Sequence, residues 1–236
     1  MIFDALKRGV GAGVVAGVAY GLFMAFVENP LITYMEEFGH DHGHSPAVSE
    51  LTTNVVSIGS GVLWGILLGT VFGVAYYLFE PTLPGTRGWR AAVLAGAGFL
   101  TVSGVPWLGL PPATPVTEQT LAPETRLAVY AGLMVLGAVL CALSIVAFRR
   151  VRTRGTVLAL GAAAAPFALG MLPVVLVPGG HTDAPDTLVT TFRSLVVMSQ
   201  LGLWALIAAT YTRLDRDGPA GQSVSEVSGA SPATGD

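Results

Sequence analysis

Three of the chain's four histidines lie within five residues of one another, in the stretch EEFGHDHGHSP over residues 36–46. In an extended segment alternate side chains point to the same side, so His40, His42 and His44 can face one ion together. Neutral imidazole binds cobalt, nickel, copper and zinc. Carboxylates that can complete the ligand set are present at Asp41, Glu36 and Glu37. We therefore predict a weak capture site for a divalent transition metal; the alternative is a polar loop that binds nothing.

A charged pair is expected within the apolar part of the chain. Arg193 lies in TFRSLVV, and an arginine at the centre of a membrane span costs roughly 2.5–3.5 kcal/mol, less near an interface. Glu28, in FVENPLI, is its first candidate partner in a structural ion pair, and Asp186 and Glu124 are the alternatives. Glu28 is equally expected as a ligand on a metal path. His181, in GGHTD, is expected as an auxiliary metal ligand.

The composition indicates the environment in which these residues act. Of the 236 residues, 52% are hydrophobic and 11% are charged, and the mean hydropathy is +0.65. Water-soluble domains carry roughly 25% charged residues, and their apolar residues do not form such long runs. The chain is therefore predicted to be an integral membrane protein embedded in the lipid bilayer.

Motifs of several functional classes are missing from the sequence. A single cysteine, Cys141, excludes a disulfide framework and a cysteine-based metal site. The sequence has no HExxH, no CxxC and no phosphate-binding GxxxxGK(S/T). We therefore expect no enzyme activity, no permanently bound cofactor and no nucleic-acid partner, and any ATP-driven step would need another subunit.

Six stretches are long and apolar enough to cross a bilayer core of roughly 30 Å, for which about 20 residues are needed. The predicted fold is therefore an all-α, polytopic bundle of about six transmembrane helices within residues 1–213. The tail, residues 214–236, is rich in Gly, Ser, Pro and Ala and is expected to be disordered. The predicted spans are 9–31, 54–79, 90–111, 126–148, 156–178 and 188–212.

The basic residues predict how the helices are oriented in the membrane. Ten of the twelve lysines and arginines fall on one side of the predicted spans, from Lys7 and Arg8 to Arg213 and Arg216. Positively charged loops stay in the cytoplasm, so both termini are expected there. The histidine-rich loop, residues 36–46, then lies on the outer face, together with His181.

Small residues and prolines predict how the helices pack and where they break. Four-residue glycine spacings favour close backbone contact, between the first two spans or with a partner subunit. Prolines inside a span free backbone carbonyls, which can line a cavity or mark a simple kink. The glycines are Gly9, Gly13, Gly17, Gly21, Gly61, Gly65, Gly69 and Gly73. The prolines are Pro106, Pro111 and Pro112 in the third span and Pro166, Pro173 and Pro178 in the fifth.

Taken together, the ENPLI turn, the acidic histidine-rich loop, the glycine-spaced second helix and VPWLGLPPATP resemble the CbtA-type cobalt transporter subunit family, over about residues 5–212. The resemblance implies cobalt(II) as the transported ligand, import tied to cobalamin supply, and a small single-span CbtB-type partner in the cell (plasma) membrane. His40, His42, His44 and Glu28 are the matching positions. Members of that family are commonly described with five spans.

Three questions are left open by the sequence. The chain is expected to be an importer subunit, but a non-transporting membrane scaffold or metal-sensing subunit fits the same features. A substrate subunit of an energy-coupling-factor-type nickel/cobalt transporter is a further alternative. A homo-oligomer is also compatible with the glycine spacings.

Overall fold

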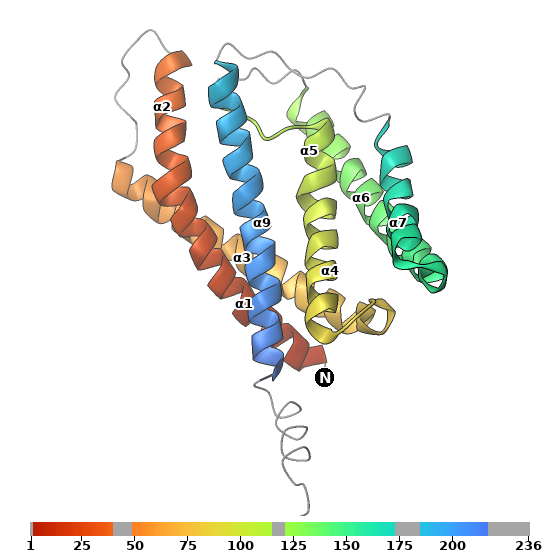
Figure 1. Ribbon diagram of the computed structural model, residues 1–236. Coiled ribbons are helices and arrows are strands. Elements are labelled where there is room, and N and C mark those ends of the chain that lie inside the picture. The colour runs from red at the N-terminus through yellow and green to blue at the C-terminus, as the bar shows by residue number, and fades with distance from the viewer. Residues whose placement is uncertain (1, 40–48, 115–120, 173–184, 217–236) are drawn as a thin grey trace, which may run out of the picture.

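The computed structural model describes residues 2–39, 49–114, 121–172 and 185–216, and within them every regular element is a helix. Five of these helices are long and apolar enough to cross a membrane, which confirms the prediction of an all-α membrane protein. They span Ile2–Glu36, Glu50–Thr82, Arg87–Gly109, Pro123–Arg154 and Asp186–Arg216. Figure 1 shows them side by side as one bundle.

Two of the five helices long enough to cross a membrane contain an internal π-helical turn. The first consists of α1 (Ile2–Phe23), a π-helical turn (Met24–Glu28) and α2 (Asn29–Gly39). The third consists of α4 (Arg87–Phe99), a second π-helical turn (Leu100–Gly104) and α5 (Val105–Gly109). π-Helical turns are rare and are found mostly as single turns within α-helices, frequently at functional sites.

The remaining helices are α3 (Glu50–Phe79), α6 (Pro123–Val151), α7 (Thr156–Gly170) and α9 (Asp186–Arg216). The chain reverses between α6 and α7 at Gly155, whose φ of 134° is a conformation that L side chains rarely adopt. α7 has 15 residues, fewer than a span needs. The predicted fifth span, 156–178, runs on into residues 173–178, which lie outside the described residues, so it stays a prediction.

The closest packing in the bundle is between α1 and α3, which run antiparallel. A methyl group placed on Gly17 would lie 2.7 Å from the carbonyl oxygen of Gly61, and one on Gly21 would lie 2.7 Å from that of Ile58. The same holds further along the seam, where Gly13 meets Gly65 and Gly9 meets Gly69. Only residues without a side chain allow two helix backbones to approach this closely.

α9 packs against a neighbouring face of α1 and also against α4. Its Leu203, Ile207 and Tyr211 join Phe72 and Tyr76 of α3 in the main apolar core. A smaller cluster joins α9 to α2 through Met35, Val189 and Phe192. Many large apolar side chains elsewhere are exposed, as expected for helix faces that contact lipid.

One end of the bundle is basic and is held together by charged contacts. Asp215 at the end of α9 pairs with Arg8 of α1 and, at 3.2 Å, with Arg87 at the start of α4. Arg90 lies 3.5 Å from Glu80, at the end of α3. The start of α1 and the end of α9 therefore lie at the same end of the bundle (Figure 1).

Candidate functional site

The proposed capture residues fall mainly outside the described part of the chain. His40, Asp41, His42, His44 and His181 all lie there. Glu36 is exposed in the last turns of α2, and Glu37 follows it in the same helix. In the described ranges, no three His, Cys, Asp or Glu side chains come together as a metal-binding group. Within the bundle, the candidate site residues are therefore single buried polar side chains.

Glu28 is the buried acidic residue of the described chain, with 6% of its surface exposed. The predicted first span, 9–31, ends three residues after Glu28. The helix instead continues through α2 for another 11 residues. It passes Pro30 because the π-helical turn directly before it has already changed the backbone hydrogen-bonding pattern.

The carboxyl group of Glu28 faces a small polar cluster formed with α9. Ser199 of α9 and Tyr20 of α1 are its polar neighbours. The Gln200 side-chain amide donates a hydrogen bond of 2.9 Å to the hydroxyl of Tyr20. Oε1 of Glu28 and Oε1 of Gln200 are both buried and have no hydrogen-bond partner in the described residues. Two oxygens without partners are unusual in a protein interior and are open to a cation.

This cluster lies deep in the bundle. Ser199 is 13 residues from Asp186, where α9 begins, which is about 20 Å at the rise of an α-helix. The cluster is also next to a cavity of about 390 Å³. The residues that line it include Tyr20, Met24, Ser103, Trp107, Tyr130 and Gln200.

Both π-helical turns border this cavity. Met24 belongs to the turn in the first span, while Val102 and Ser103 belong to the turn in the third. The hydroxyl of Tyr130, on α6, donates a 2.7 Å hydrogen bond to the carbonyl oxygen of Val102. A π-helical turn changes which backbone groups are paired, so carbonyl oxygens become available to side chains or ions.

A second polar contact lies beside Glu28, between α2 and α3. Asn29 donates hydrogen bonds to the Ser57 hydroxyl at 2.9 Å and to the Asn54 side chain at 3.1 Å. Sequence reasoning did not single out Tyr20, Gln200 or this group. Their signal was a lone polar residue within an apolar run, and it did not reveal that they meet.

Arg193 lies on α9 seven residues after Asp186, about 10 Å along the helix. Its Nε is buried and has no hydrogen-bond partner within the described ranges. The ion pairs of the described residues include none between Arg193 and Glu28. An ion pair between Glu28 and Arg193 therefore has no support from the described contacts.

The proline positions are only partly connected with helix breaks. Pro106 follows a π-helical turn, whereas Pro111 and Pro112 come after α5 has ended. Pro166 lies inside α7, which continues to Gly170. Pro173 and Pro178 lie outside the described residues.

Comparison with known proteins gives one match. The model of the family described as "Probable cobalt transporter subunit (CbtA)" matches residues 3–215, which is consistent with the resemblance drawn from the sequence. No curated protein and no solved structure matches the chain.

Proposed function

This chain belongs to the family of probable cobalt transporter subunits, CbtA, and from that premise we propose that it carries the intramembrane part of a cobalt(II) import path. The family makes it a subunit of a transporter, with cobalt as the ion carried. Five membrane-crossing helices make it a multi-pass membrane protein. The finer assignments below are our proposals.

Capture of the ion begins in the histidine-rich loop. His40, His42 and His44, with Asp41, Glu36 and Glu37 as further ligands and His181 as an auxiliary one, exchange the ion's water for protein ligands. Supporting this, α2 ends at Gly39, one residue before the tract. Its 11 residues extend about 17 Å, so one helix connects the tract to Glu28.

Glu28 is the proposed ligand within the membrane, and the observation that carries this proposal is its burial with Oε1 unpaired among the described residues. A buried carboxylate without a partner costs free energy, and ionisable residues within spans are typical of ion pathways. Further oxygen ligands nearby are the side-chain oxygen of Gln200 and the hydroxyls of Tyr20 and Ser199. Cobalt(II) accepts such ligands in place of water.

Orientation and partners follow from the same proposal. We place both termini in the cytoplasm and the histidine-rich loop outside the cell (plasma) membrane, by the positive-inside rule. The basic end of the bundle, which holds Arg8, Arg87 and Arg90, would then be the inner end. A small single-span CbtB-type subunit is the proposed partner, and cobalamin synthesis is the proposed destination of the cobalt.

The capture step is tested by measuring cobalt accumulation in cells that lack their own importers, by elemental analysis. The chain is expressed with its small partner, as wild type and as His40/His42/His44→Ala. The matched control replaces three polar residues of another outer loop, Thr117, Gln119 and Thr120, by alanine. We expect the histidine variant alone to lose accumulation at low external cobalt and to recover at high external cobalt, because the tract only concentrates the ion.

The second candidate function is a non-transporting scaffold or metal-sensing subunit. It is favoured by the lack of a three-ligand metal group among the described residues. It predicts that the purified chain binds cobalt while wild-type cells accumulate no more than empty cells. Co-purification of an ATPase would instead support a substrate subunit of an energy-coupling-factor-type transporter.

A further inference from the structure

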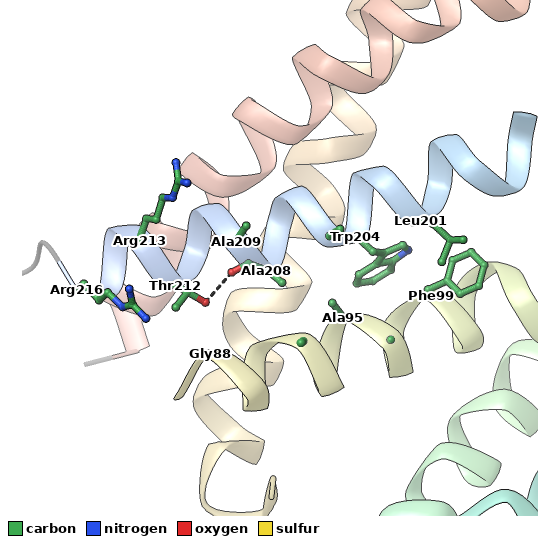
Figure 2. A pocket seen from close by; sticks show the side chains of 13 residues that line it. Gly88, Ala95, Phe99, Leu201, Trp204, Ala208, Ala209, Thr212, Arg213 and Arg216 are labelled. Atoms are coloured by element: carbon green, nitrogen blue, oxygen red, sulfur yellow. Dashed lines mark hydrogen bonds between the residues drawn. The ribbon is translucent and has the colours of Figure 1, made fainter. Parts of the chain in front are cut away.

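A groove runs along the lipid-facing side of the bundle between α4 and α9. It contains none of the residues of the Glu28 cluster. Its volume is about 490 Å³. Figure 2 shows both arginines, Arg213 and Arg216, at one end of the groove, and Leu201, Trp204 and Phe99 at the other. Between them the lining is mostly glycine and alanine.

The floor of the groove is open, unlike the seam between α1 and α3. A methyl group placed on Gly88 or Gly96 would have no atom within 4 Å. Trp204 marks the deep end, where its ring packs against Gly98 of α4 and its Nε1 is buried without a partner in the described residues. The described part of the chain therefore leaves some of the α4 and α9 surface uncovered.

The length of the groove indicates what can cover it. On α9 it extends from Leu201 to Arg216, and on α4 from Gly88 to Phe99, or about 22 and 17 Å. One leaflet contributes about half of the roughly 30 Å hydrocarbon core. The groove thus matches one acyl chain with its headgroup, whereas a transmembrane helix needs a seam twice as deep.

The charge at its shallow end indicates the headgroup. Arg213 and Arg216 are exposed, and neither takes part in an ion pair of the described residues. The neighbouring acid, Asp215, is already engaged by Arg8 and Arg87. Two guanidinium groups at headgroup depth are therefore available to a phosphate, to which arginine binds with two parallel hydrogen bonds.

We propose that the groove between α4 and α9 binds one anionic phospholipid, with its phosphate between Arg213 and Arg216 and an acyl chain along the glycine and alanine lining. Basic pockets between transmembrane helices are suited to anionic headgroups. The site is independent of the cobalt path, so it survives if the proposed function fails.

The test is lipid retention by the full-length chain, measured by native mass spectrometry after exchange with phosphatidylglycerol or phosphatidylcholine in detergent. Arg213→Gln/Arg216→Gln removes the headgroup contacts, and Arg150→Gln/Arg152→Gln makes the same charge change at exposed arginines of another helix end. We expect wild type and the control pair to retain one phosphatidylglycerol. The groove pair should retain at least about tenfold less, because each arginine contributes near the membrane surface.

A second pair of variants separates the acyl chain from the charges. Gly96→Leu fills the groove, and Gly132→Leu adds the same side chain to open space on α6. Only Gly96→Leu should lower phosphatidylglycerol retention. The proposal would be overturned if wild type retained both lipids equally or if the arginine pair retained as much phosphatidylglycerol as wild type. It would also be overturned if a Gly96→Cys variant cross-linked to a polypeptide in the groove.

Discussion

Two helix–helix seams, one between α1 and α3 and the other between α4 and α9, contain the same small residues but pack differently. The first is closed and the second is open. Between α1 and α3, glycines every fourth residue bring the two backbones into direct contact. Between α4 and α9, Gly88, Gly96 and nearby alanines border an open groove. Small residues thus permit close packing but do not produce it, since the opposite helix must present a matching face along the full length.

Their different surroundings explain why one seam closes. α1 has glycine on the side that faces α3 and carries Tyr20, in contact with Gln200, on the side that faces α9. α4 instead meets α9 through the large side chain of Trp204, which occupies the space above Gly98. Nearer the basic end, Ala91 and Ala95 of α4 are buried in the core shared with α9, while Gly88 and Gly96 stay uncovered beside them.

The largest effect is expected from adding a side chain within the α1–α3 seam, where there is no space for one. In Gly13→Val the new Cβ would lie 2.9 Å from Cα of Ile66, with backbone atoms that cannot move aside. We expect α1 and α3 to separate and little folded protein to be recovered, as judged by size-exclusion chromatography in detergent. Overpacking commonly costs 1–3 kcal/mol, and here the obstacle is backbone. A monodisperse Gly13→Val protein of wild-type stability would contradict the seam.

A smaller effect is expected at the basic end, where Asp215 joins α1, α4 and α9. Asp215→Asn leaves Arg8 and Arg87 without their acid and should destabilise the protein by about 1–2 kcal/mol. The measurement is the Tm in detergent. Glu80→Gln is the matched control, because its contact with Arg90 is longer and more exposed, and it should change stability by less than about 1 kcal/mol. A larger loss in the control would refute this ranking.

Tyr130→Phe tests the hydrogen bond that supports the π-helical turn of the third span. Removing the hydroxyl leaves the Val102 carbonyl without that donor and should cost about 1 kcal/mol, seen as a lower Tm. Tyr77→Phe, at an exposed tyrosine of α3, is the comparison. Equal shifts in the two variants would show that the bond to Val102 adds no specific stability.

The smallest effect is expected in the open groove. Gly96→Ala adds a methyl group where no atom lies within 4 Å, and alanine favours the helix by up to about 1 kcal/mol over glycine. We expect a Tm equal to or above that of the wild type, in contrast to Gly13→Val. A Tm well below that of the wild type would mean that the groove is closed in the membrane-extracted protein.

The sequence predicted the helical membrane fold and the close backbone contact at the glycines, because both depend on local composition and period. It left open whether the glycines of the first span pack on the second span or on a partner, since spacing does not name the opposite helix. The wide turns at Met24–Glu28 and Leu100–Gly104 were not predicted. In both, a proline follows as the second residue after the turn, at Pro30 and Pro106. Pro106 was predicted to break the third span, whereas Pro30 was not singled out.

The candidate site could also be predicted only in part, because the sequence does not show which helices meet. Glu28 was singled out because a carboxylate in an apolar run is costly. Its neighbourhood was not foreseen, because Tyr20 and Gln200 are 180 residues apart and meet only through helix packing. The histidine tract could be recognised from composition alone, and its ligand role stays a prediction.

Glu28 is the residue that we propose as a ligand on the cobalt path. Glu28→Gln keeps the shape and removes the charge, so it should remove a desolvation cost and leave the Tm equal or higher. Glu50→Gln, at an exposed carboxylate in the first turn of α3, is the control.

The most direct test is cobalt accumulation by cells that express equal membrane amounts of wild type, Glu28→Gln and Glu50→Gln with the small partner. Loss of a metal ligand should lower affinity by about tenfold or more, so we predict that Glu28→Gln accumulates little cobalt while Glu50→Gln matches wild type. Wild-type accumulation by a folded Glu28→Gln protein would contradict the claim and leave Glu28 without a place on the path.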